Sequence, residues 1–319
     1  MRAKKRFGQH FLSDINILNR IVDAAEITPD ETVLEVGPGL GALTAVLAQR
    51  ARRVVAVEVD RDLIAGLRAR FADAPNVEIV EGDVLEISPG ALLGFTTEAQ
   101  RHRGLISEGD GFTAEPYVVV ANLPYNIASP ALRRFLEGDV RPRRLVVMVQ
   151  LEVAEAIVAK PGRMSLLSVA TQVYGDTRMV MKVVPGAFSP PPKVESAVVR
   201  IDVAPVPKVG VPIELFFRTV RAGFGNPRKQ LRNSLSFGFH VKQEVIDIVM
   251  TAAGVDATLR PQVLSLDDWA AITRAWDGFT TEAQRHRGSD GGEEDTATSP
   301  RPSPPRHGEQ AGGEGGLAS

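Results

Sequence analysis

The sequence predicts an α/β domain with a largely parallel sheet, followed by a small all-helical domain. Two observations lead to this prediction. Up to about residue 207, short apolar runs alternate with stretches of helical periodicity, which is typical of βαβ units in a sheet covered on both faces. Beyond a proline-rich stretch the pattern is helical only. We therefore expect domains over residues 1–207 and 208–277.

Each apolar run of the first domain is short and rich in valine, as buried strands are. Glycine, acidic residues or asparagine follow several of these runs. In a parallel sheet these polar positions share the edge where ligands bind. The predicted strands are 32–36, 53–58, 77–81, 117–121, 144–149 and 195–201, with helices over 40–51 and 62–71. For the second domain we expect helices over 214–222, 227–236, 242–253 and 265–276.

The composition is that of an ordinary globular protein, with 44% hydrophobic and 24% charged residues among 319. No apolar run is long enough for a membrane span. The cysteine count of zero excludes thiolate zinc sites and cysteine nucleophiles. It also fits a cytoplasmic protein. We therefore expect a cytoplasmic chain with no membrane partner and no metal.

The last 42 residues, 278–319, hold 9 glycines and 4 prolines and almost no large apolar side chains. Such a segment cannot bury enough surface to offset its chain entropy, so we expect a disordered tail. Residues 94–104 are identical to residues 278–288. A duplicated binding motif is one interpretation; we prefer a translated repetitive element, with a passenger insertion at about 97–113.

A glycine-rich turn follows the first predicted strand and contains Gly37 and Gly39. Glycines at such a turn let a ligand approach the backbone. Glu58 ends the second strand about twenty residues later, where an acidic residue binds ribose hydroxyls. This layout is compatible with a nicotinamide dinucleotide or with S-adenosylmethionine (SAM), and alone it does not choose between them.

The residues Asn122, Leu123, Pro124 and Tyr125 directly follow the fourth strand. This motif type is the signature of methyltransferases that act on exocyclic amines. The Asn122 side-chain carbonyl and the Leu123 backbone carbonyl can accept the two N–H bonds of an adenine amine. Pro124 stiffens the turn, and Tyr125 offers a ring on which an extruded base stacks. A strand-end turn with chance spacing is the alternative.

With these motifs, residues 4–277 outside the insertion resemble the ribosomal RNA adenine dimethyltransferases. The resemblance implies a Rossmann-like SAM-dependent methyltransferase domain followed by a helical RNA-binding domain. Six ordered motifs carry it, at 5–12, 35–44, 57–60, 81–84, 122–125 and 188–196.

The resemblance also implies roles for single residues. His10, Leu12, Gly37, Gly39, Glu58, Asp83 and Asn122 would contact SAM, with Asp83 on the adenine amine and His10 acting through its backbone. Phe188 would complete a base sandwich with Tyr125, so the catalytic set is Asn122, Leu123, Pro124, Tyr125 and Phe188. Each has a structural alternative. Phe188 suits a core, and Asp83 suits a helix cap.

Two basic clusters are candidates for contact with RNA phosphates. One comprises Lys4, Lys5 and Arg6. The other comprises Arg221, Arg228, Lys229 and Arg232, in a stretch (218–242) without acidic residues. We expect Arg228 and Arg232 to share a helical face at spacing i, i+4. A solvated surface is the alternative for either cluster.

The function that the resemblance implies is dimethylation of two adjacent adenosines near the 3′ end of small-subunit (16S) rRNA to N6,N6-dimethyladenosine, coupled to subunit assembly. The cofactor would be SAM and the partner rRNA in a small-subunit precursor, with the free protein a monomer. Alternatives are a large-subunit rRNA methyltransferase of the macrolide-resistance type and a non-catalytic assembly factor. A dehydrogenase would leave residues 122–125 unexplained.

Overall fold

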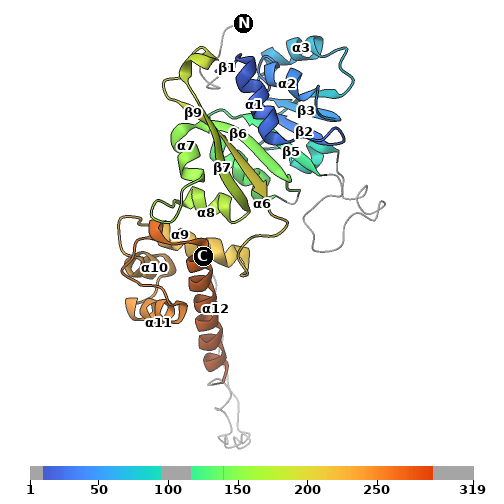
Figure 1. The fold of residues 1–319 in the computed structure, drawn as a ribbon. Helices are drawn as coiled ribbons and strands as arrows, with labels where there is room; N and C mark the ends of the chain where they lie inside the picture. Colours follow the sequence, from blue (N-terminus) through green and yellow to red (C-terminus); the bar gives the residue numbers. More distant parts are fainter. Residues whose placement is uncertain (1–9, 95–115, 139, 290–319) are drawn as a thin grey trace, which may run out of the picture. The chain divides into compact units, whose positions relative to one another are not determined.

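The computed structural model describes residues 10–94, 116–138 and 140–289 of the chain. In these ranges the main feature is a seven-stranded sheet with the strand order β4-β3-β2-β5-β6-β9-β7 (Figure 1). The predicted α/β fold with a largely parallel sheet is confirmed.

The parallel part of the sheet positions the site. Its strands are β2 (Thr32–Val36), β3 (Arg53–Glu58), β4 (Val77–Glu81), β5 (Tyr117–Asn122) and β6 (Arg144–Gln150). From β2 the chain runs outward to β3 and β4, then returns to β5 on the other side of β2. This reversal leaves a crevice outside the carboxyl ends of β2 and β5, the place where open α/β sheets bind ligands.

Helices cover this part of the sheet and close its core. The first begins after Asp14, whose side chain caps the backbone N–H groups of Asn16 and Ile17. Its buried residues share a core cluster with α2 and with valines of β2, β3 and β5. The helices of this region are α1 (Ile15–Ala25), α2 (Ala42–Leu47), α3 (Arg61–Arg70), α4 (Pro89–Leu93) and α6 (Ala128–Glu137).

An antiparallel extension completes the sheet. β9 (Ser196–Val203) pairs with β6 and with β7 (Gly175–Val183), and β7 is a strand that the sequence analysis missed. Its register shifts between Met179 and Met181, which breaks the alternation that marks a strand in a sequence. The helices α7 (Leu151–Ile157) and α8 (Leu166–Gln172) precede β7 in the chain.

A separate two-stranded sheet brings the N-terminal segment to the site. β1 (Phe11–Leu12) pairs with β8 (Phe188–Ser189), with Leu12 opposite Phe188. This pairing joins residues far apart in the sequence at one side of the cavity described below.

Buried cations hold α1 against the sheet. Arg144 of β6 and Arg200 of β9 are 9% and 6% exposed. Both donate to Glu26, at 2.9 and 2.5 Å, and to Asp202, at 2.5 and 2.8 Å. They also donate to the backbone carbonyls of Ala25 and Ala24 at the end of α1. The hydrogen bond from Arg200 and the two positive charges lower the pKa of Glu26 to about 2.

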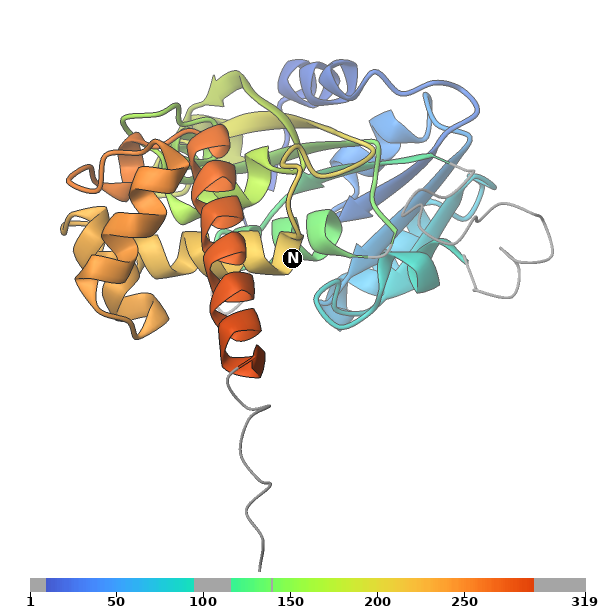
Figure 2. The same cartoon turned by 90° about the horizontal axis from the view of Figure 1, so that it is seen from below.

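The C-terminal region is helical, as predicted, and comprises α9 (Ile213–Phe224), α10 (Leu231–Phe239), α11 (Gln243–Ala253) and α12 (Leu266–Ser289). Figures 1 and 2 show α9, α10 and α11 gathered at one end of the sheet. Met1–Asp277 form one compact unit, and the division at residue 207 stays a prediction.

Two local expectations for this region are wrong. α10 begins at Leu231, so Arg228 and Lys229 precede it and Arg228 does not share a helical face with Arg232. α12 continues to Ser289, so residues 278–289 are helical rather than the start of a disordered tail. The sequence Glu282, Ala283 and Gln284 has high helix propensity and favours this continuation. The prediction of disorder rested on the composition of residues 278–319 as a whole, in which most glycines and all prolines follow this stretch.

Other sequence predictions lie outside the described residues. These are Lys4, Lys5 and Arg6, the insertion at about 97–113, and the chain from residue 290 onward. Among the helices that are described, none combines the length and apolar character of a membrane span. Within the same ranges, no group of three or more His, Cys, Asp or Glu side chains could hold a metal ion.

Candidate active site

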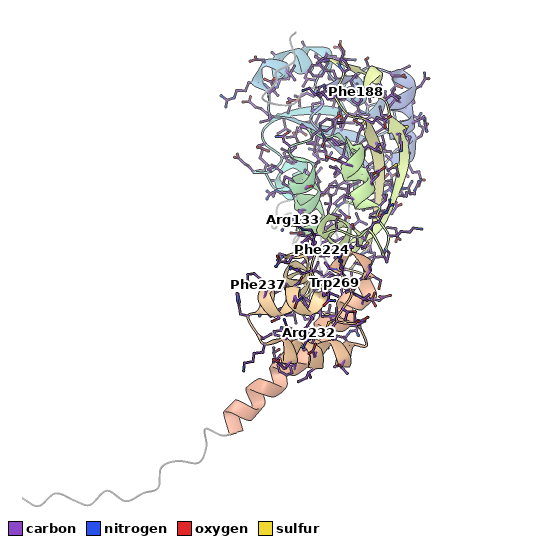
Figure 3. The ribbon with its side chains drawn as sticks, turned by 90° about the vertical axis from the view of Figure 1, so that its left-hand side faces the viewer. Arg133, Phe188, Phe224, Arg232, Phe237 and Trp269 are labelled. Carbon is purple, nitrogen blue, oxygen red and sulfur yellow. The ribbon has the colours of Figure 1, made fainter. Side chains whose placement is uncertain are left out.

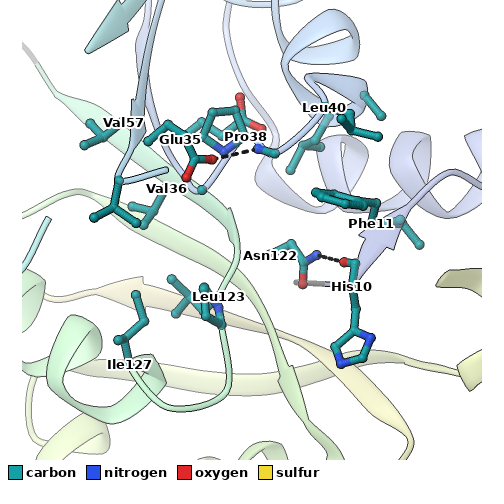
Figure 4. A pocket seen from close by; sticks show the side chains of 18 of the residues that line it. His10, Phe11, Glu35, Val36, Pro38, Leu40, Val57, Asn122, Leu123 and Ile127 are labelled. Carbon is teal, nitrogen blue, oxygen red and sulfur yellow. Dashed lines mark hydrogen bonds between the residues drawn. The ribbon is translucent and has the colours of Figure 1, made fainter. Parts of the chain in front are cut away.

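A cavity of ≈ 680 Å³ opens at the carboxyl ends of β2, β3 and β5, a size usual for a cofactor or small-molecule site. It is lined by residues from β1, from the loops after these strands and from β8 (Figure 4). Every residue predicted for cofactor binding or catalysis lines it: His10, Leu12, Gly37, Gly39, Glu58, Asp83, Asn122, Leu123, Pro124, Tyr125 and Phe188.

The glycine turn forms one wall. Gly37 and Gly39 have φ values of 68° and 60°, a left-handed conformation that favours glycine. A Cβ on Gly39 would lie 3.0 Å from the ring of Phe11, so the turn packs tightly against β1. The backbone N–H of Gly37 donates to the carbonyl of Val57 at 2.9 Å, which fixes the turn to the end of β3.

Glu58 is held firmly at the end of β3. Its carboxylate is 5% exposed and accepts from the backbone N–H groups of Gly39, at 3.1 Å, and Asp60, at 2.9 Å. Burial raises the pKa of Glu58, and these hydrogen bonds oppose that shift. The side chain is therefore held in a fixed orientation where it lines the cavity.

Asp83 has both of the properties weighed from the sequence. It lines the cavity just after β4. Its Oδ1 accepts from the backbone N–H of Leu85 at 2.8 Å, which stabilises the turn that follows. Asp83 therefore lines the cavity and also caps a turn, and its contact with SAM stays a prediction.

Asn122 ends β5 and is oriented by the N-terminal segment. Its Nδ2 donates to the backbone carbonyl of His10 at 3.2 Å (Figure 4). This hydrogen bond fixes the orientation of the side-chain amide. Oδ1, which is the acceptor of the amide, can then accept an N–H from another group. The turn after it is closed by a hydrogen bond from the Ile127 N–H to the Pro124 carbonyl at 3.0 Å.

The rings of His10, Tyr125 and Phe188 line the same cavity. The Tyr125 hydroxyl hydrogen-bonds with Ser196 at 2.8 Å, and its ring stacks with that of His10 at a centroid distance of 6.0 Å and 28° between planes. His10 Nδ1 bonds the carbonyl of Pro190 at 2.8 Å. Phe188 is 6% exposed and belongs to the core cluster while lining the cavity, so its packing role and its cavity position are both real.

Glu35 also lines the cavity, although it was not among the residues predicted for the site. Its side chain is 1% exposed, and Oε2 has no hydrogen-bond partner among the described residues. Burial, together with the nearby Glu58 carboxylate, raises the pKa of Glu35 to about 8. The available signal was a single carboxyl group inside the otherwise apolar strand 32–36.

Of the predicted RNA-binding cations, those that the structure describes lie in the C-terminal helical region, in α9, in α10 and between these helices. Arg221, Arg228 and Lys229 are exposed. Arg232 is half-buried and forms an ion pair with Asp247 of α11 at 2.5 Å. Asp247 therefore partly neutralises its charge.

Comparison with known proteins connects this geometry to a family. The model of the ribosomal RNA adenine dimethylase family matches residues 1–273. A protein of Dehalococcoides mccartyi strain CBDB1, named ribosomal RNA small subunit methyltransferase A, is 42% identical over 279 residues, covering 87% of this chain and 90% of its own. A protein of Geobacter metallireducens with the same name is 42% identical, covering 86% of this chain and 96% of its own.

Two solved structures are also similar to this chain. The crystal structure of the 23S rRNA methyltransferase ErmE matches with a TM-score of 0.64 and 29% identity, over 84% of this chain and 99% of that chain. A dimethyladenosine transferase from Plasmodium falciparum matches with a TM-score of 0.66 over 86% of this chain and 98% of that chain. At 23% identity the second similarity shows the shared fold alone.

Proposed function

Since the chain belongs to the ribosomal RNA adenine dimethylase family, we propose that it uses SAM to dimethylate two adjacent adenosines near the 3′ end of small-subunit (16S) rRNA. The product is N6,N6-dimethyladenosine, and the substrate is a small-subunit precursor. The observation that carries the proposal is the position of residues 122–125 at the end of β5, on the same cavity as Glu58 and the glycine turn.

The residues present fit SAM. Glu58 offers a fixed carboxylate for ribose hydroxyls, and Gly37 and Gly39 leave the backbone open to close approach. The buried Glu35 Oε2 lacks a partner among the described residues, which suits a donor group on a ligand. Asp83, Leu12 and His10 line the same cavity. When bound, SAM supplies the electrophilic methyl group.

The chain's own contribution is to position and polarise the amine. An adenine amino nitrogen is a weak nucleophile because its lone pair is delocalised into the ring. Asn122 Oδ1 and the Leu123 carbonyl accept its two N–H bonds and favour a pyramidal nitrogen. After transfer, the nitrogen carries an extra proton that leaves to solvent, so no strong general base is required.

Tyr125 and Phe188 hold the extruded base in this proposal. Stacking compensates for the loss of neighbouring bases in the RNA. The hydrogen bond between Tyr125 and Ser196 fixes the plane of the tyrosine ring. The exposed cations Arg221, Arg228 and Lys229 contribute affinity through phosphates, and Lys4, Lys5 and Arg6 are assigned the same role from the sequence.

A large-subunit rRNA methyltransferase is the second candidate, because the ErmE structure shares the fold at 29% identity. The relatives at 42% identity carry the small-subunit name and favour the first candidate. A non-catalytic assembly factor on this fold would have no need for the intact set of Glu58, Asp83 and residues 122–125.

Labelled SAM offered with small or large ribosomal subunits that lack the modification separates these candidates. We expect label in small-subunit rRNA and N6,N6-dimethyladenosine in the nucleoside digest. Label only in large-subunit rRNA would support the second candidate. Absence of transfer to either, with RNA binding retained, would support the assembly factor.

A further inference from the structure

We propose that Phe237 of α10 is a stacking platform for an unpaired base of the rRNA substrate, beside cations that hold the flanking phosphates. This inference rests on the proposed function because it requires an RNA substrate. It adds an aromatic contact to a surface for which the sequence indicated only charge.

Phe237 is 70% exposed, more than any other large apolar side chain of the described residues. A second exposed ring accompanies it. His240 lies beside it with a centroid distance of 6.3 Å and 50° between planes. His240 adopts a left-handed conformation, φ 57°, where α10 ends. A single exposed apolar residue is common, but two exposed rings side by side form a surface that suits a nucleobase.

The contact between α9 and α10 brings cations to this surface. A Cβ on Gly238 would lie 2.7 Å from the Cα of Ala222, so the two backbones almost touch there. Phe237 and Arg221 are the chain neighbours of these residues. Their Cα atoms therefore lie within about 12 Å of each other, given 3.8 Å between consecutive Cα atoms. Both side chains are exposed, and this spacing is one that a short stretch of RNA can span.

Arg218 lies one turn before Ala222 and is held in place by aromatic rings. Its guanidinium lies 5.5 Å from the centroid of the Phe239 ring. Phe239 in turn stacks on Trp276 at 3.9 Å with 9° between planes. The Arg218 charge is thus fixed at low entropic cost while its residue stays exposed.

The charge of the segment that contains Phe237 favours a polyanion as the occupant. Residues 218–242 hold six cations and no acidic residue. Asp247 of the neighbouring α11 is paired with Arg232. An exposed aromatic ring in a basic segment matches the combination by which proteins bind unpaired nucleic acid.

Figure 3 shows Phe188 near the top of the picture, beside the sheet, and Phe237 lower, among the C-terminal helices. The stack at Phe237 therefore acts on capture of the substrate and leaves the methyl-transfer step untouched. This separation gives the proposal a distinctive signature: affinity for the subunit changes, and the rate at saturating subunit does not.

The test measures binding of the full chain to unmodified small subunits over a range of salt concentrations. Phe237→Ala should weaken binding by roughly 5-fold to 100-fold. The slope of log affinity against log salt should stay that of the parent protein, because no phosphate contact is lost. Arg221→Ala should instead reduce the slope by about 1. Phe237→Trp should restore binding.

Ile248→Ala is the matched control, since Ile248 is an exposed apolar residue, 58% exposed, on the neighbouring α11. It should bind like the parent protein. Parent-like binding by Phe237→Ala would overturn the inference while leaving the proposed function intact. Equal losses of affinity in Phe237→Ala and Phe237→Trp would also overturn it. The same holds if Phe237→Ala weakens binding to subunits but does not weaken binding to protein-free rRNA. A parent protein that neither binds nor methylates subunits would instead contradict the proposed function.

Discussion

Two carboxyl groups on neighbouring strands of the cavity have different surroundings. Glu58 accepts two backbone N–H groups, whereas Glu35 Oε2 has no partner among the described residues. Burial raises the pKa of both, and that of Glu35 reaches about 8. At neutral pH without a ligand, Glu35 is therefore largely protonated, and a group that donates to it or carries positive charge would favour its ionised form.

Replacing Glu35 by glutamine should change how stability depends on pH. The unfolded chain ionises this carboxyl near pH 4.5, while the folded chain keeps the proton to about pH 8. This carboxyl group therefore lowers the free energy of unfolding as pH rises through that interval. Above pH 8 its contribution no longer changes with pH. As pH rises through this interval, the free energy of unfolding of Glu35→Gln should increase relative to that of the parent protein by up to about 1.4 kcal/mol per pH unit. Urea unfolding of the cofactor-free proteins between pH 5 and 8 measures this; parallel stability curves would refute the assignment.

Asp83 offers a second test at the residue scale, because its two roles can be separated. Asp83→Asn keeps an oxygen that can accept from the Leu85 N–H, and Asp83→Ala removes it. Both variants should bind SAM more weakly, by about 1.5–3 kcal/mol if a charge-assisted hydrogen bond is lost. Only the alanine variant should also lower the melting temperature. Calorimetry showing parent-like SAM affinity in both would leave Asp83 with a capping role alone.

At the scale of elements, the packing of α1 depends on its last turn. The buried guanidinium groups of Arg144 and Arg200 bridge the end of this helix to β6 and β9 through Glu26 and Asp202. They also satisfy carbonyls that a helix end leaves free. The cluster thus couples the helix to both strands.

Glu26→Gln should destabilise the protein by about 1 kcal/mol at neutral pH, which is less than the usual value for hydrogen bonds to charged groups because the Glu26 side chain is 58% exposed. The pKa of Glu26 is about 2 in the folded protein against 4.5 ordinarily. Its stabilisation is therefore complete above pH 4.5 and is lost as pH falls toward 2. Denaturant curves at pH 7 and pH 3 should show the variant's deficit shrinking. Asp23→Asn, which removes an exposed pair with Arg50, should cost less at pH 7.

The sequence predicted those elements whose signal is local. The apolar-rich runs at 32–36, 53–58 and 77–81 became strands with the expected bounds. β7 was missed because its register shift breaks the alternation. The start of α10 was misplaced because the Leu231 and Arg232 N–H groups donate to carbonyls of Leu259 and Ala257, a tertiary contact that the sequence does not reveal.

For the whole molecule, the position of the cavity could be predicted because parallel strands place their carboxyl ends at one edge. The contacts that complete it could not. His10 meets Pro190, and Tyr125 meets Ser196, only because β1 pairs with β8 and because β9 lies beside β6. These contacts join residues that are 180 and 71 positions apart in the sequence, and such pairings leave no periodic signal.

The insertion at 97–113 should be dispensable. Gly94 ends α4, and Tyr117 begins β5 at the end opposite Asn122. Five residues of strand separate Tyr117 from Asn122, about 16 Å. A chain lacking 97–113 should methylate small subunits at the parent rate and melt at the same temperature or higher. A folded deletion variant without methyl transfer would show that the segment has a role.

In the proposed mechanism, Asn122 positions the target amine for methyl transfer. Single-turnover transfer from SAM to unmodified small subunits, with mass spectrometry of the nucleosides, tests it most directly when Asn122→Ala is compared with the parent protein. Removing one preorganised acceptor should slow the chemical step by on the order of a hundredfold or more. SAM affinity and melting temperature are measured on the same samples to separate chemistry from binding and folding. Slow formation of N6,N6-dimethyladenosine is the predicted result; dimethylation by Asn122→Ala at nearly the parent rate would contradict the account.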